Sequence, residues 1–151
     1  MAVSKHRHDD PNFVEHALSV LREGGYRITR QRRAVVALLD AACDPLMPYD
    51  IKDRLDAGGT SIDTVSVYRI LARFEAMGIV HRIPSSGGYV KCHLQPEADA
   101  CHHYLVCRIC NRVEEIPCEG LEKLERTVAD QTGFAVETHN IELSGICLAC
   151  R

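Results

Sequence analysis

Two pairs of cysteines have the spacing of a metal site. Cys107 and Cys110 form one Cys-x-x-Cys motif, and Cys147 and Cys150 form a second near the end of the sequence. Two thiolates at this spacing sit on one tight turn, so both sulfurs can bind one ion at about 2.3 Å. Four such sulfurs complete a closed tetrahedral zinc site, which is structural because it has no exchangeable position. Two disulfides or ordinary buried cysteines are the alternatives.

The compartment decides between these alternatives. The sequence starts with polar residues rather than an apolar signal segment, and no stretch approaches the length of a membrane span. A reducing cytosol disfavours structural disulfides, so we expect a cytoplasmic protein that holds zinc. The chain has no tryptophan and eight cysteines, which predicts modest cores that metal helps to stabilise.

The charge is distributed unevenly along the chain. The 151 residues carry a formal net charge of −3, which by itself argues against nucleic-acid binding. Residues 1–84 hold 12 Lys and Arg against 11 Asp and Glu, whereas residues 85–151 hold 6 against 10, so the halves carry +1 and −4. Cationic contacts are therefore expected in the first half and metal binding in the second.

Apolar residues at helical spacing dominate the first half. They predict helices that start at Asn12, at the capping residue Thr29, at Asp50 and at residue 63. The helix over 63–77 is the most regular and leaves small polar and arginine side chains outside its apolar face. A helix, a turn and such a second helix form the layout that puts a recognition helix into a major groove. A small helical bundle would have the same periodicity.

The remaining pattern changes to strands. Alternation in 79–84 and 89–94 around a Ser-Ser-Gly-Gly turn predicts a β-hairpin, which completes a winged helix-turn-helix. Strands are expected over 102–106, 112–116 and 134–143, with a helix over 120–131. The predicted fold class is α+β, and its sheet edge and helix are natural surfaces for a homodimer.

The predicted division of the chain follows from these elements. A winged-helix DNA-binding domain occupies residues 1–84, of which 1–11 form a flexible tail. The hairpin turn and hinge cover 85–91, and a small α/β metal-binding dimerisation domain covers 92–151.

Several ordered motifs together resemble the ferric uptake regulator family, from about residue 14 to the end. The motifs are Arg27-Ile-Thr-Arg-Gln-Arg32, Ser66-Val-Tyr-Arg69, Gly78-Ile-Val-His81, His102-His103 ahead of the first cysteine pair, Gly133-Phe134 leading to His139, and Gly145-Ile-Cys147. The resemblance implies a homodimeric, metal-dependent transcription regulator with an N-terminal winged helix and a C-terminal dimerisation domain.

The same resemblance implies a DNA-contacting surface. It assigns Arg27 to the minor groove and Tyr49, Tyr68 and Arg69 to the major groove. An arginine can read guanine with two hydrogen bonds, and a hydroxyl such as that of Ser66 can hold a phosphate.

A second set of metal ligands is expected at the hinge. His81 and Cys92 resemble positions of the zinc uptake regulator branch of that family, and Glu115 and His102 would complete the set. His93 or His103 could replace His102 as the fourth ligand. A metal bound here would join the two domains and select one conformer of a hinged dimer. The thiolate favours Zn²⁺ over Fe²⁺ or Mn²⁺.

A third set follows from strand alternation and the resemblance. Successive strand residues point to opposite faces, so His103 shares a face with Cys101 rather than with His102. The resemblance implies a further metal site at His103, Glu122 and His139, and Cys101 would be its fourth ligand.

These features together predict a zinc-responsive repressor of zinc-uptake genes. It would bind double-stranded operator DNA as a dimer when zinc is bound, with one structural and at least one regulatory Zn²⁺ per protomer. Neither a membrane nor a small-molecule substrate is an expected partner, and no catalytic residue is expected.

Two rival functions stay open. An iron, manganese or peroxide sensor of the same family would need mostly His, Asp and Glu ligands at the hinge. A zinc hydrolase or deaminase would need an open coordination position and a general acid or base. Pro117-Cys118 is followed by Glu119-Gly120 with no second cysteine, which does not fit a deaminase motif.

Overall fold

The computed structural model of the chain describes residues 13–92, 102–117, 120–137 and 139–151. The chain forms two compact units, Met1–His93 and Leu94–Arg151. Both strands of the hairpin belong to the first unit. The backbone of Tyr89 exchanges two hydrogen bonds of 2.9 Å with Leu46 and so ties the hairpin to the helical part.

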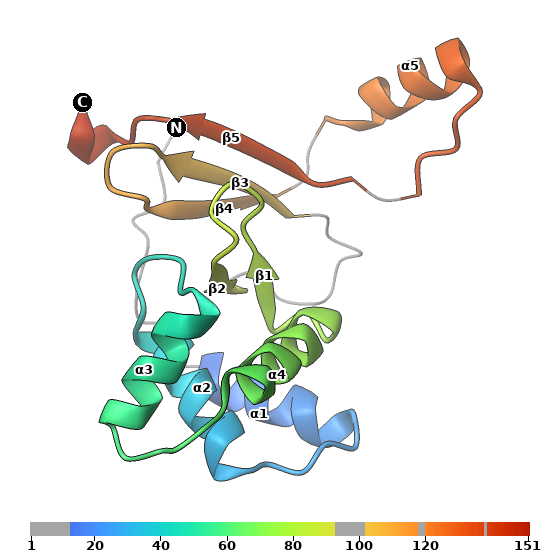
Figure 1. The fold of residues 1–151 in the computed structure, drawn as a ribbon. Helices are drawn as coiled ribbons and strands as arrows, with labels where there is room; N and C mark the ends of the chain where they lie inside the picture. Colours follow the sequence, from blue (N-terminus) through green and yellow to red (C-terminus); the bar gives the residue numbers. More distant parts are fainter. Residues whose placement is uncertain (1–12, 93–101, 118–119, 138) are drawn as a thin grey trace. The chain divides into compact units, whose positions relative to one another are not determined.

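Four helices form the body of the first unit (Figure 1). They are α1 (Phe13–Glu23), α2 (Arg30–Ala41), α3 (Pro48–Ala57) and α4 (Thr64–Ala76). The Thr29 hydroxyl accepts a hydrogen bond of 3.2 Å from the N–H of Arg32, which confirms the predicted cap of α2. Asp63 caps α4 in the same way through the N–H of Ser66 at 2.8 Å. Pro48 begins α3, because its missing N–H costs nothing in a first turn.

The apolar faces of these helices meet in one core. The predicted stripe of α4 is buried at Val67, Ile70, Leu71 and Phe74, and Met77 packs against it. In α2 the structure buries Val35, Val36 and Leu39. The core fixes the orientation of α4, so the opposite face of this helix is held outward.

The predicted hairpin follows α4 directly. It consists of β1 (Val80–Arg82) and β2 (Tyr89–Lys91), paired antiparallel with His81 opposite Val90. The turn needs glycine at position 88, because a Cβ there would lie 2.7 Å from the Cβ of Pro45. Helices followed by this hairpin make the first unit a winged helix, as the sequence predicts.

A buried ion pair connects the hairpin to the helices. Lys91 in β2 is only 4% exposed. Its ammonium donates to the carboxylate of Asp40 at 2.8 Å and to the carbonyl of Asp40 at 3.1 Å, and it lies 5.5 Å from the centre of the Phe13 ring. A buried charge is tolerated only when it is paired, so this contact holds the strand that carries Cys92 against α2.

We expect Asp40→Ala to lower the free energy of unfolding by about 2 to 3 kcal/mol, because it removes the carboxylate that pairs with the buried Lys91 ammonium. Urea unfolding of the full chain, followed by circular dichroism, measures the change. Asp44→Ala is the matched control at an exposed carboxylate and should stay within about 0.5 kcal/mol of the parent. The double variant Asp40→Ala/Lys91→Met should recover most of the loss. An unchanged stability in Asp40→Ala would show that the pair does not hold the strand.

The second unit contains a three-stranded sheet with the order β4-β3-β5. Its strands are β3 (His102–Cys107), β4 (Val113–Pro117) and β5 (Ile141–Gly145). β4 runs antiparallel to β3, and β5 runs parallel to it. A helix, α5 (Glu122–Thr132), separates β4 from β5 in sequence and ends at Gly133, whose φ of 70° is left-handed. The predicted number of strands and helices in this unit is confirmed.

The strand expected over 134–143 begins later in the structure than predicted. The observed strand begins at Ile141, and residues 134–137 are irregular. The register gives the reason, because Ile141 pairs with His103 near the first residue of β3. Earlier residues therefore have no neighbouring stretch of β3 with which to pair.

Few side chains are buried in the second unit. Among its described residues only His103, Tyr104 and Cys107 are buried, and α5 buries none of its side chains. The apolar side chain of Leu124 in α5 is 55% exposed in the single chain. The described part of this unit therefore has no sizeable apolar core of its own, and other sources of stability are needed.

A search of the described residues found no helix long and apolar enough to cross a membrane.

Candidate metal centres and nucleic-acid interface

The four predicted cysteines come together in the second unit. Cys107 ends β3 and Cys110 lies on the turn that follows, while Cys147 directly precedes the short 3-10 helix η1 (Leu148–Cys150) and Cys150 ends it. The pairing of β5 with β3 brings the second motif to the first, since Gly145 lies opposite Cys107. The four sulfurs all lie within 4.8 Å of one another.

The sulfur geometry fits zinc. Sγ of Cys110 lies 3.8 Å from Sγ of Cys147. Sulfurs at the corners of a tetrahedron with zinc–sulfur bonds of 2.3 Å are about 3.8 Å apart, whereas a disulfide bond is about 2.05 Å long. All four residues are free thiols. The donor set therefore suits a tetrahedral zinc ion.

Backbone N–H groups around Cys107 favour its thiolate. The N–H of Cys147 donates to Sγ of Cys107 at 3.4 Å, and with the N–H groups of Cys110 and Ile109 it lowers the pKa of Cys107 from 9.0 to about 6. Hydrogen bonds with the thiols of Cys147 and Cys110 instead raise the pKa of Cys150 to about 12. Cys107 is thus a ready ligand, whereas Cys150 loses its proton only when a cation replaces these hydrogen bonds.

The hairpin brings His81 and Cys92 together in the first unit. His81 lies in β1 and Cys92 directly follows β2, where its N–H donates to the carbonyl of Ile79 at 3.0 Å. Both side chains are half-buried, and their ligand atoms lie within 4.8 Å of each other. An imidazole and a thiol at this separation can share one metal ion.

The other predicted hinge ligands belong to the second unit or to undescribed positions. Glu115 is half-buried in β4, opposite Tyr104. The backbone of His102 starts β3, but its side chain lies outside the described part of the structure, as does all of His93.

The third predicted set is only partly assembled. His103 is buried, and neither of its ring nitrogens has a hydrogen-bond partner among the described residues. Its ring centre lies 5.4 Å from that of His139, and Nδ1 of His139 lies 2.5 Å from a carboxylate oxygen of Glu125. A buried imidazole nitrogen without a partner is a position that a metal ion could satisfy.

A carboxylate that was not predicted, that of Glu125, lies beside this group. Glu122 is exposed at the start of α5, and Glu125, one turn later, contacts His139. Glu125 could have been predicted from the sequence, because it lies three residues after Glu122 and residues at this spacing share one face of a helix. Cys101 lies outside the described residues.

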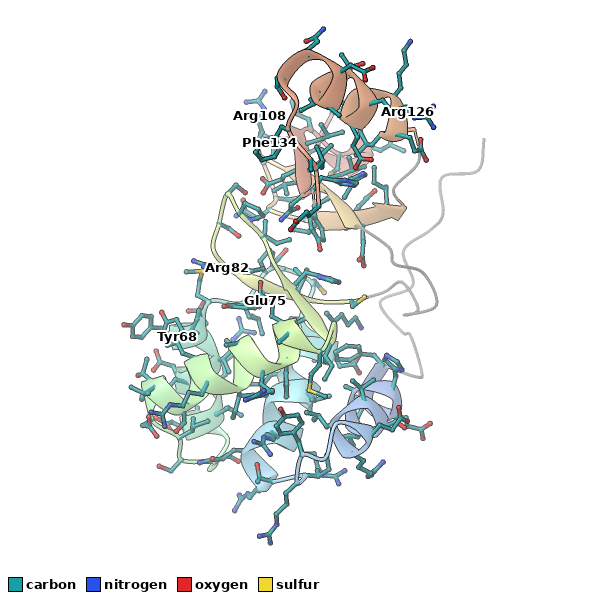
Figure 2. The ribbon with its side chains drawn as sticks, turned by 90° about the vertical axis from the view of Figure 1, so that its right-hand side faces the viewer. Tyr68, Glu75, Arg82, Arg108, Arg126 and Phe134 are labelled. Atoms are coloured by element: carbon teal, nitrogen blue, oxygen red, sulfur yellow. The ribbon has the colours of Figure 1, made fainter. Side chains whose placement is uncertain are left out.

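The predicted DNA-contacting tyrosines form a pair on the first unit. Tyr49 of α3 is 61% exposed and Tyr68 of α4 is 45% exposed. Their rings meet edge to face, with centres 6.3 Å apart. Figure 2 shows Tyr68 on the outer side of α4. Two large aromatic rings exposed together on a recognition helix and its neighbour suit contact with a partner.

The other predicted contacts lie near the start of α2 and along α4. Arg27 and Arg69 are exposed, and the carbonyl of Arg27 accepts a hydrogen bond of 2.6 Å from Arg32. The hydroxyl of Ser66 donates to Asp63 at 2.5 Å, so this side chain supports the cap of α4. A phosphate contact by Ser66 would compete with that hydrogen bond.

A family model described as the ferric uptake regulator family matches residues 23–144. The chain belongs to the ferric uptake regulator family. The match includes α2 to β5 and therefore both units of the chain. The resemblance that the motifs implied is thereby confirmed.

Named relatives include regulators of zinc and of iron uptake. The chain is 31% identical to a zinc uptake regulation protein of Escherichia coli, over 91% of this chain and 81% of the relative. It is 33% identical to a zinc uptake regulation protein of Mycobacterium tuberculosis, over 84% of this chain and 96% of the relative. It is also 30% identical to a ferric uptake regulation protein of Legionella pneumophila, over 87% of this chain and 96% of the relative.

Among solved structures, the chain is similar to a zinc uptake regulator complexed with zinc and DNA. The TM-score is 0.82 at 29% identity, and the similarity covers 97% of this chain and 96% of that chain. The shared fold confirms the expected α+β class with an N-terminal winged helix in this member of the ferric uptake regulator family.

Proposed function

We propose that this chain is a zinc-responsive repressor that binds operator DNA as a homodimer when zinc is bound, and that it represses zinc-uptake genes. The observation that carries the proposal is the pairing of His81 with Cys92 in the hairpin directly after α4. A metal bound there acts on the hairpin that follows the candidate recognition helix. The relatives named for zinc uptake and the similarity to a regulator bound to zinc and DNA support the same function.

The four-cysteine cluster is the structural zinc site in this proposal. Cys107, Cys110, Cys147 and Cys150 would hold one Zn²⁺ per protomer and fix the end of the chain to β3. Four sulfurs leave no coordination position for water or substrate, so this zinc has no catalytic role.

A second zinc is the regulatory one. We assign His81 and Cys92 as its ligands in the first unit, Glu115 as its ligand in the second, and His102 as the fourth. The thiolate of Cys92 is the donor that selects zinc, because Fe²⁺ and Mn²⁺ prefer nitrogen and oxygen ligands. Ligands drawn from both units would let the ion restrain one unit relative to the other, and so favour the conformer that binds DNA.

A third metal ion would bind at His103 and His139. Glu125 joins the predicted Glu122 as a carboxylate for this site, and Cys101 is its expected fourth ligand. The buried nitrogens of His103 support the assignment. Nitrogen and oxygen donors would also suit iron or manganese, which is the feature that favours an iron-, manganese- or peroxide-sensing function as the alternative.

The homodimer accounts for the apolar side chains that the second unit leaves exposed. The largest are Leu148, Phe134, Ile109, Leu124 and Leu143, all more than half exposed in the single chain. Apolar surface on this scale is covered in stable proteins by a partner. Two copies would also present two α4 helices to two half-sites of an operator.

A gel shift on the promoter region of the protein's own gene tests the function. Chelator, zinc, iron and manganese are added in turn to the metal-free protein. We expect retardation with zinc alone, lost when chelator is added. Retardation with iron or manganese but not zinc would favour the alternative, and equal retardation with chelator and with zinc would contradict the proposed switch.

A further inference from the structure

A cleft of about 500 Å³ opens beside α4 in the first unit, and arginines surround it. Arg69 and Arg73 enter it from α4, and Arg32 enters from the first turn of α2. Tyr26, which precedes α2, forms another part of the wall, and Ile70 lies among the apolar residues. Of the residues that line the cleft, only Arg69 is among the predicted DNA contacts.

The ring of Tyr26 organises two of the guanidinium groups. The centre of the Arg73 guanidinium lies 4.7 Å from the ring centre, and that of Arg32 lies 5.7 Å from it. Both distances are within the range of cation–π contact. Arg32 is held further by its hydrogen bond of 2.6 Å to the carbonyl of Arg27. Two positive groups are thus fixed around one aromatic ring.

No carboxylate neutralises these charges within the part of the chain that the structure describes. Among the described residues, no ion pair involves Arg32, Arg69 or Arg73. Three arginine residues line this one cleft, so their positive charges together attract an anion to it. Arginine binds phosphate with two parallel hydrogen bonds, so a phosphate is the anion that this cleft fits.

The position of the cleft on α4 suggests the source of the phosphate. Each residue of an α-helix is turned by about 100° around the helix axis from the one before it. Tyr68 and Arg73 of α4 therefore lie about 140° apart around that axis, and Arg69 lies between them. Tyr68 meets Tyr49 at one border of this exposed face, and Arg73 meets Tyr26 at the other. A helix seated in a major groove has one DNA backbone on each side.

We propose that the cleft of Tyr26, Arg32 and Arg73 binds a backbone phosphate of the DNA at one edge of the groove that α4 enters. The assignment rests on the proposed DNA-binding function and adds a contact that is independent of sequence. Arg69 faces the groove between the two borders, whereas Arg73 and Arg32 hold the strand that flanks it. Stacking on Tyr26 keeps both guanidinium groups oriented before DNA arrives, so little side-chain freedom is lost on binding.

Arg73→Gln tests the cleft in the zinc-loaded full-length dimer. Affinity is measured by fluorescence anisotropy between 50 and 200 mM salt, with a duplex from the promoter region and with a duplex of scrambled sequence. We expect about tenfold weaker binding to both duplexes, and a plot of log affinity against log salt that is flatter by about 0.9, as for one lost phosphate contact. Arg22→Gln, the same charge change at an exposed position of α1, is the matched control and should leave the slope unchanged. Arg73→Lys keeps the charge and should retain the parental slope.

Three results would overturn the assignment. An unchanged slope in Arg73→Gln would show that the cleft holds no phosphate, and a loss confined to the promoter duplex would indicate a base contact instead. Tight binding of inorganic phosphate or pyrophosphate without DNA, lost in Arg73→Gln, would assign the cleft to a soluble ligand. The proposed function is judged separately: if chelator leaves DNA affinity unchanged while the slopes differ as expected, the zinc switch is wrong and the phosphate cleft stands.

Discussion

Replacing Cys107 with serine should unfold the second unit. The described part of this unit buries only three side chains, of which Cys107 is one, so a zinc ion held by the four cysteines would supply stability that an apolar core otherwise provides. Structural zinc sites contribute about 10 to 16 kcal/mol in small metal-dependent domains. Zinc content by mass spectrometry and amide hydrogen exchange across β3, β4 and β5 measure the result. We expect loss of one zinc per protomer together with loss of protection in all three strands.

Cys150→Ser is the graded comparison for that experiment. The sulfur of Cys107 accepts an N–H hydrogen bond from Cys147 and its residue is 4% exposed, whereas Cys150 is half-buried in the final turn of the chain. We expect Cys150→Ser to weaken zinc binding while β3 keeps its protection in excess zinc. Full protection of the three strands in Cys107→Ser without bound zinc would contradict the structural role of the site.

Replacing Cys92 with serine should abolish the dependence of DNA binding on zinc. A thiolate is the donor that makes the regulatory site prefer zinc, and serine at neutral pH offers only a neutral hydroxyl. Zinc should raise the DNA affinity of the parent by roughly 5- to 150-fold, the usual range of coupling between two sites, and should leave that of Cys92→Ser unchanged. Anisotropy titrations with chelator and with zinc measure both values, and sedimentation should find the variant dimeric with its structural zinc retained.

Cys43→Ser is the matched control for Cys92. Cys43 is an exposed free thiol of the same unit and belongs to none of the ligand groups found among the described residues. Its replacement should preserve the zinc response. A response that survives in Cys92→Ser, or disappears equally in Cys43→Ser, would remove Cys92 from the regulatory site.

Local signals made much of the first unit predictable. The cap at Thr29 and the apolar stripe of α4 depend on residues within a few positions of each other, and both are confirmed. The two Cys-x-x-Cys motifs could also be recognised from the sequence, because each motif is contained in a single turn. Their meeting depends on the parallel pairing of β5 with β3, which is a contact between distant parts of the sequence.

Long-range contacts explain what the sequence did not reveal. The burial of Lys91 depends on Asp40, far away in the sequence, and a lysine in a strand would ordinarily be expected at the surface. The strand expected from residue 134 begins at Ile141, because its length is set by β3 rather than by its own residues. Glu122 and Glu125 share one helix face, and only the position of His139 distinguishes them.

The zinc stoichiometry of DNA binding tests the proposed mechanism most directly. Metal-free protein is titrated with zinc while zinc occupancy and DNA affinity are measured in the same samples. The first equivalent per protomer should fill the four-cysteine site and restore the fold of the second unit with little gain in DNA affinity. Affinity should then rise as the site of His81 and Cys92 fills with the next zinc. An affinity that is complete after the first equivalent, or that never changes with zinc, would contradict a regulatory zinc in the hairpin.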